Sequence, residues 1–289
     1  MLVRAIYGLL ASCGFAFAQT PDVSIVTDVR LSLSQTKDGN RIRFYDPLGR
    51  HSTVSLSLNL ETGYRVYVSE RFARIPNDTM GNQLELAYVE APGLWRMGYI
   101  DLPFGRQFLL RDAGFGAELR TVLLFDNLPI HIATVDNGKR RTRGVSARVG
   151  DRIGVSFARG DHFAASATSL TPFRAVEDSP GVSRGFRQAY GVDGRFTAGG
   201  TLFTAELVSL QDGHTDNDRE DQVIDLTMGW RGSDDRTGVT LGYSRSLEGR
   251  KNAYRAEGEW IVNQKVSVFG VIKISRDHRI AATGVRLRF

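Results

Sequence analysis

The sequence contains a single cysteine, few prolines and no long apolar run. One cysteine in 289 residues excludes a disulfide framework and any cysteine-based metal site. No stretch of 18 consecutive apolar residues occurs, so the sequence offers no transmembrane helix. Basic residues number 37 and acidic residues 32, which is far from the clustered positive charge of a nucleic-acid-binding protein, and we expect no nucleic-acid partner. Since 42% of the residues are hydrophobic, the chain can bury a core, which argues against intrinsic disorder.

The N-terminus has the pattern of an export signal. A short basic start precedes an apolar run over residues 5–17, which ends in a small-x-small cleavage site. We therefore expect residues 1–18 to be removed as a signal peptide and residues 19–289 to form the exported domain. A lipoprotein cleavage box, which would leave a lipidated Cys13 at the mature N-terminus, is the alternative.

Hydrophobic and polar residues alternate throughout the exported domain, in stretches of about ten residues. Val54, Leu56 and Leu58, for example, are separated by serines. This period of two predicts about sixteen strands; because segments 40–45 and 163–170 are also strand-like, about 14 or 18 are the alternatives. The stretches begin near residues 23, 51, 63, 83, 94, 116, 128, 143, 152, 187, 201, 221, 237, 252, 265 and 280.

The connections between these stretches are alternately long and short. The long ones are mostly polar, whereas the short ones are tight turns such as the pair at residues 92–93. In an up-and-down meander, this alternation places loops at one end of the sheet and turns at the other. Bacterial transmembrane barrels have the same asymmetry.

Alternation alone fits either a soluble sandwich or a membrane barrel, so the direction of the apolar face decides between them. Aromatic residues near the strand ends of the apolar face favour lipid outside, because amphipathic rings suit a bilayer interface. Closure of an even number of strands would also satisfy every backbone group in hydrocarbon. These aromatic residues are Tyr64, Trp95, Tyr99, Trp230, Tyr243, Tyr254, Trp260 and Phe289.

The last stretch ends in Phe289, with Val285 and Leu287 alternating before it. With the export signal and the meander, this ending resembles the Gram-negative outer-membrane porins. The resemblance implies an all-β fold: a closed antiparallel up-and-down transmembrane β-barrel in the cell outer membrane. In that family such a C-terminus is read by the barrel-insertion machinery, so these three residues are the implied membrane-insertion signal. The resemblance implies outer-membrane lipid and lipopolysaccharide as partners. It also allows assembly of the chain into a homotrimer.

A barrel of about sixteen strands leaves an aqueous channel. We therefore expect a porin that passes small hydrophilic solutes and ions by passive diffusion, with no enzyme activity and no cofactor. A modest anion preference is one hypothesis for its selectivity, and a charge-balanced lining is the other. The pore-lining candidates are Arg30, Arg65, Arg96, Arg255, Glu257, Lys273, Arg286 and Arg288.

The third long connection, residues 103–115, combines apolar side chains with charged ones. Resemblance to trimeric porins implies that this loop folds into the lumen and forms a constriction. Arg106, Arg111 and Asp112 are the constriction-loop candidates, and a single acidic residue makes a cation-selective constriction doubtful. The alternative is a loop that lies over the rim or at a subunit contact.

Other classes of function receive less support from the sequence. A surface-interaction barrel with an occluded lumen is the main alternative. A lipid hydrolase would require a His-x-Ser pair, and His51 lacks that spacing. The five histidines are scattered, and the oxygen-rich segment 212–221 lacks EF-hand spacing, so we expect no metal site. The basic run 139–143 could pair with lipopolysaccharide phosphates.

Overall fold

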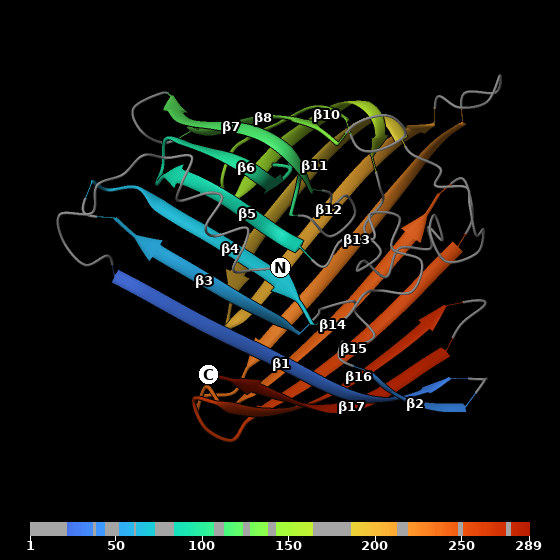
Figure 1. Ribbon diagram of the computed structural model, residues 1–289. Helices are drawn as coiled ribbons and strands as arrows, with labels where there is room; N and C mark the ends of the chain where they lie inside the picture. The colour runs from blue at the N-terminus through green and yellow to red at the C-terminus, as the bar shows by residue number, and fades with distance from the viewer. Residues whose placement is uncertain are drawn as a thin grey trace.

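Seventeen antiparallel strands form one sheet in the computed structural model of the protein (Figure 1). The structure describes residues 22–36, 39–43, 52–60, 62–72, 84–106, 113–123, 128–137, 143–163, 186–212, 219–247, 251–275 and 279–289. The expected signal peptide therefore lies outside the described residues. The strands are β1 (Asp22–Thr36), β2 (Gly39–Arg43), β3 (Thr53–Asn59), β4 (Arg65–Arg71), β5 (Leu84–Ala91), β6 (Trp95–Asp101), β7 (Ala113–Leu123), β8 (Leu128–Asp136), β9 (Arg143–Val149), β10 (Ile153–Phe163), β11 (Phe186–Ala198), β12 (Thr201–Asp212), β13 (Arg219–Arg231), β14 (Thr237–Ser246), β15 (Lys251–Ile261), β16 (Val266–Ser275) and β17 (Arg279–Arg288).

The sheet closes into a barrel because β1 pairs along both of its edges. One edge pairs with β17, and the other pairs with β3 over residues 22–28 and with β2 over residues 32–36. Since β2 and β3 follow one another along the same edge, the barrel has sixteen strand positions, as the sequence predicts. The strand-like segment 40–45 accounts for β2, which extends the second position and does not add another.

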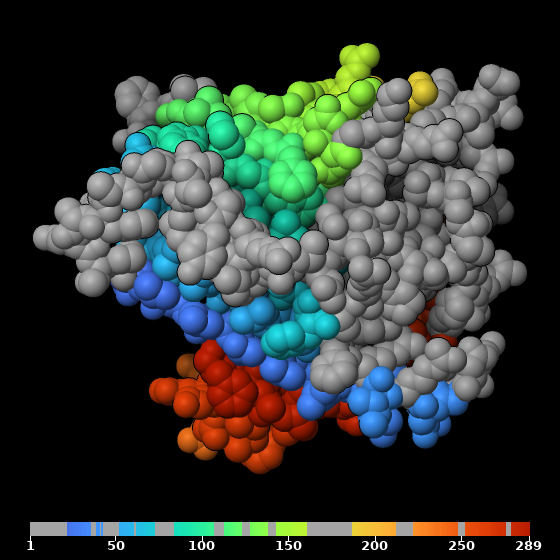
Figure 2. Space-filling view, viewed as in Figure 1, coloured from blue at the N-terminus to red at the C-terminus, as the bar shows by residue number. Residues whose placement is uncertain are grey.

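The seam between the first and last strands is hydrogen-bonded to its end. The Thr27 amide donates to the Phe289 carbonyl at 2.9 Å, and the Phe289 amide donates back to Thr27 at 3.0 Å. In Figure 2 the blue N-terminal strands lie directly against the red C-terminal ones. Closure thus removes the free edge that an open sheet would leave with unpaired backbone groups.

The two faces of the sheet differ sharply in polarity, with the apolar face outside. Outward side chains such as Ile153 and Phe196 are 74% and 63% exposed, whereas inward ones such as Glu206 and Asp225 are buried. A soluble protein would have the opposite arrangement. The apolar face therefore surrounds the barrel as a continuous belt, which is what contact with hydrocarbon requires.

Aromatic side chains occupy the outward face near the strand ends, as the sequence predicts. Trp230, Trp260 and Phe289 are exposed there, and Tyr64 packs beside Trp95 with ring centroids 5.8 Å apart. Tyr99 differs from the expectation because it is buried, at 4% exposure. Its ring packs edge-on against Phe115, 5.0 Å away on the neighbouring strand.

The predicted strand starts agree with the structure to within about three residues. The largest difference concerns β7, which begins at Ala113 and not near residue 116. The third long connection is therefore shorter than expected and covers residues 102–112. Among the described residues, no helix is long and apolar enough to cross a bilayer.

We predict that Asp28→Ala weakens the barrel at its seam. Asp28 accepts two hydrogen bonds from the Arg286 Nε, at 2.9 and 3.0 Å, and both side chains are largely buried. Removal of the carboxylate leaves a guanidinium without its acceptor, which costs about 1–3 kcal/mol. Heat-dependent electrophoretic mobility of the folded protein should show a lower unfolding temperature.

The control for this variant is Asp151→Ala. The Asp151 side chain also binds an arginine, Arg195, at 2.9 Å, but the two side chains are 58% and 48% exposed. Such a pair contributes about 0–1 kcal/mol. Equal unfolding temperatures for the two variants would contradict a stabilising role for the seam pair.

Candidate pore lining and constriction

The third loop begins by crossing into the barrel interior. After β6, Leu102 and Phe104 are completely or almost completely buried. The Ser146 hydroxyl on β9 donates to the Pro103 carbonyl at 3.0 Å, and the Gly105 amide donates to the Ser156 hydroxyl on β10 at 2.8 Å. The root of the loop, residues 102–106, is thus fixed to the inner side of β9 and β10.

Two glycines make room for this contact. The Phe104 ring lies over Gly191 of β11, where an added Cβ would approach the ring to 2.9 Å. Gly105 has a positive φ of 50° and faces Glu206 of β12, so that a Cβ there would come within 1.9 Å of the carboxylate. Both the backbone conformation and the close approach therefore require glycine at position 105.

Arg106, one of the three constriction-loop candidates, reaches the same wall. Its Nε lies 2.7 Å from the Asp193 carboxylate, and its Nη2 donates to backbone carbonyls in the β9–β10 turn. Partial burial lowers the pKa of the Arg106 guanidinium, and the neighbouring Asp193 carboxylate opposes that shift. The other two candidates, Arg111 and Asp112, lie outside the described residues.

A row of alternating charges crosses four neighbouring strands on the inner face. In the strand register Arg65 lies beside Glu90, Glu90 beside Arg96, and Arg96 beside Glu118. The side chains form ion pairs along the row, and Arg96 also binds Asp101 at 2.5 Å. Opposite charges in directly paired positions stabilise a sheet, and here they face the lumen and not solvent outside the barrel.

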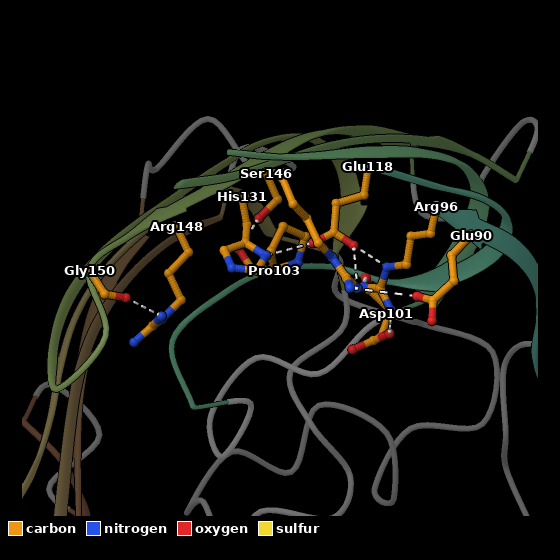
Figure 3. Close-up of polar contacts among 10 residues, drawn as sticks. Glu90, Arg96, Asp101, Pro103, Glu118, His131, Ser146, Arg148 and Gly150 are labelled. Atoms are coloured by element: carbon orange, nitrogen blue, oxygen red, sulfur yellow. Dashed lines mark hydrogen bonds and ion pairs between the residues drawn. The ribbon is translucent and has the colours of Figure 1, made fainter. Parts of the chain in front are cut away.

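A second row, one position nearer the turn end, consists of Arg120, His131 and Arg148. The Arg120 Nη2 lies 3.2 Å from the Glu118 carboxylate, and the His131 Nδ1 lies 2.9 Å from it. Figure 3 shows the Glu118, His131 and Arg148 side chains projecting from the concave side of the wall. Glu118 is therefore shared by three cationic or proton-binding side chains from three strands.

Three acidic residues lie side by side farther round the wall, and arginines compensate them from both sides. Asp193, Glu206 and Asp225 are neighbours in the register and all are buried. Arg148 binds Asp193 through two nitrogens at 2.8 and 3.1 Å, and Arg255 binds Asp225 at 2.9 and 3.0 Å. Two-pronged arginine–carboxylate pairs of this kind are strong and fix the side chains in place.

All the pore-lining candidates occur on the inward side of the alternation. Arg30 lies opposite Arg286, and Arg255 lies opposite Lys273, so these cations are indeed adjacent. The Arg286 guanidinium is bound to Asp28 and lies 3.9 Å from Glu259, which makes this part of the lining mixed in charge. The remaining candidates on this face are Arg65, Arg96, Glu257 and Arg288.

The structure also brings together inward residues that are not among the candidates from the sequence. These are Glu118, His131, Asp193 and Asp225. The same alternation marks them as inward, but nothing in the sequence shows which charges become partners. Within the part of the chain that the structure describes, no cluster of His, Cys, Asp or Glu suits a metal ion.

The terminal residues implied as an insertion signal lie at the seam. Val285 and Phe289 are exposed on the outward face, with Phe289 65% exposed at the barrel end. Leu287 shares their side of the strand, opposite Val29 of β1. Their position allows contact from outside the barrel, while recognition by an insertion machinery stays a prediction.

A barrel of sixteen strand positions, apolar outside, charged inside and entered by its third loop, has the porin fold. By sequence, the chain matches no described protein family and no curated protein. Solved structures do match. The outer membrane protein OmpT of Vibrio cholerae in its trimer form is 9% identical, with a TM-score of 0.65 over 94% of this chain and 100% of that one.

Two further structures are similar to the chain. The outer membrane channel DcaP of Acinetobacter baumannii is 11% identical, with a TM-score of 0.63 over 96% of this chain and 99% of that one. An anion-selective porin from Comamonas acidovorans is 10% identical, with a TM-score of 0.61 over 93% of this chain and 100% of that one. At these identities the likeness shows the fold of the Gram-negative outer-membrane porins.

We predict that Gly105→Ala displaces the root of the third loop. The methyl group meets the Glu206 carboxylate, and the positive φ strains any residue except glycine. Strain of this kind costs about 1–3 kcal/mol. Unfolding temperature and limited proteolysis at the third loop should both report the change.

Gly199→Ala is the matched control for this variant. Gly199 has a similar φ of 55°, but an added Cβ there has nothing within 4 Å. It therefore carries the backbone strain without the steric contact. If both glycine variants behave alike, the contact between the loop and the wall has no role in holding the loop.

Proposed function

We propose that the protein is an outer-membrane porin, a water-filled channel for passive diffusion of small hydrophilic solutes and ions. The observation that carries this proposal is the polarity of the closed barrel, whose charged side chains point inward. Charges on an inner wall require water or partners, and barrels with about sixteen strands are wide enough to hold a water column. The likeness in fold to the outer membrane channel DcaP and to the anion-selective Comamonas porin supports the proposal.

The third loop provides the constriction in this proposal. Its root is fixed to the β9–β12 side of the wall by hydrogen bonds, a buried phenylalanine and the Arg106–Asp193 pair. A root held in this way narrows the passage on the β9–β12 side of the wall. Channel selectivity then depends on the pore width and on the charges that remain accessible beside the loop.

A structural barrel with an occluded lumen is the second candidate, and one observation favours it. Apolar side chains gather on part of the inner wall around the loop root and are almost fully buried. Apolar packing of this kind excludes water from the space that it fills. The cluster consists of Tyr88, Ile100, Leu102, Phe104, Ala133, Val135, Ala158, Ala189, Val208, Leu210 and Val223.

Electrical recording distinguishes the two candidates. Purified, refolded full-length protein added to a planar lipid bilayer should produce stepwise current increases of uniform size, since each inserted barrel adds one conducting path. An occluded barrel inserts without steps. Heat-denatured protein is the control, and insertion without current in the native sample would reject the porin proposal.

Export and assembly belong to the same proposal. Protein recovered from the outer-membrane fraction should begin at Gln19, as terminal sequencing can show, whereas a lipidated Cys13 terminus would indicate the lipoprotein route. A homotrimer fits the trimer form of the Vibrio protein. Mass measurement of the native protein in detergent tests that assembly.

We also propose that the barrel carries no catalytic activity. In the described residues, His131 is bound to a carboxylate and has no serine nucleophile among the partners given above. A lipid-hydrolysis assay on the folded protein is the direct test. Lipid hydrolysis that persists after the barrel has been purified again would reject this part of the proposal.

A further inference from the structure

Arg65, Arg120 and His131 on the inner wall are more accessible than the two carboxylates that bind them. The Glu90 and Glu118 side chains are 2% and 1% exposed. By contrast, Arg65 is 40%, His131 32% and Arg120 24% exposed. In this set the carboxylates therefore lie closer to the wall than the three cationic or proton-binding side chains. A solute near them meets these side chains first, although the set as a whole is nearly neutral.

The two buried carboxylates hold the three exposed side chains in one patch. Glu90 binds Arg65 and lies 3.6 Å from Arg120, while Glu118 lies 3.2 Å from Arg120 and 2.9 Å from His131. Each guanidinium has five N–H donors, and shared carboxylates cannot take all of them. The patch thus combines fixed positions with N–H groups that the two carboxylates do not fully use.

We propose that Arg65, Arg120 and His131 form a luminal binding site for small oxyanion solutes, meaning carboxylates, phosphates or sulfate. The inference rests on the proposed channel, since the ligand must reach the inner wall through water. Arginine binds such anions through paired hydrogen bonds that match their oxygen spacing. Chloride lacks that geometry, so the site distinguishes oxyanions from simple ions of the same sign.

Binding at this site is coupled to protonation of His131. The imidazole faces Glu118 and Arg120 on β7 and lies opposite Arg148 on β9, while Arg96 on β6 shares the same carboxylate. Histidine is the side chain that ordinarily changes charge between pH 5 and 8. A bound anion favours the protonated ring, and by reciprocity protonation strengthens anion binding. Affinity therefore increases as the pH falls.

Sulfate is the probe for the experiment, because its charge is constant over this pH range. Full-length protein in a planar bilayer carries a potassium chloride current, and sulfate is added on both sides. We expect sulfate to reduce the unit conductance, with a half-blocking concentration about fivefold lower at pH 5.5 than at pH 8. If current steps appear but sulfate does not reduce them, the proposed binding site is wrong. If no current steps appear at all, the proposed channel is wrong.

Three kinds of variant test the residues. Arg65→Gln and Arg120→Gln should each raise the half-blocking concentration about tenfold. Glu90→Gln should lower it, because neutralising the buried acid strengthens the positive patch; general disruption of the wall would have the opposite effect. His131→Gln should keep the block at pH 8 and lose its pH dependence.

Arg231→Gln is the matched control, since it removes one positive charge from an exposed position at the end of β13. Its half-blocking concentration should stay within about twofold of the unaltered protein. Equal effects of Arg231→Gln and Arg120→Gln would show a general charge effect and overturn the site. A block that keeps its pH dependence in His131→Gln overturns the coupling to that residue.

Discussion

The pairing of β1 with β17 is the constraint on which the structure depends. A sheet with one polar and one apolar face can expose the apolar face to hydrocarbon only if no backbone edge remains free. The mutual hydrogen bonds between Thr27 and Phe289 complete the ladder at its last residue. Closure then separates an interior from an exterior, and this separation determines where every alternating side chain lies.

The closed wall forces its inward charges to find partners on adjacent strands. Charges placed at paired positions, such as Arg96 beside Glu118, neutralise one another without help from the bilayer side. Where like charges are adjacent, as with Asp193, Glu206 and Asp225, arginines from other positions compensate them. In the Arg65–Glu90 and Arg120–Glu118 pairs the acid is more deeply buried than the base.

The elements that follow a local rule could be predicted, and the contacts that depend on tertiary structure could not. Period-two alternation located the strands and their inward sides, because the side chains of a strand necessarily alternate. It also indicated the extra strand β2, but not that β2 and β3 share one edge of β1. The Arg106–Asp193 pair joins a loop to a strand far along the chain, and only the closed barrel brings them together. The contact between His131 and Glu118 likewise depends on strand pairing, because the two residues lie on different strands.

The apolar cluster around Phe104 includes inward side chains from strands between β5 and β13. Hydrated ions lose water-binding partners wherever a surface offers only hydrocarbon. In the proposed channel, this part of the wall offers hydrated ions no polar partner, so the cross-section available to them is smaller than the diameter of the barrel suggests.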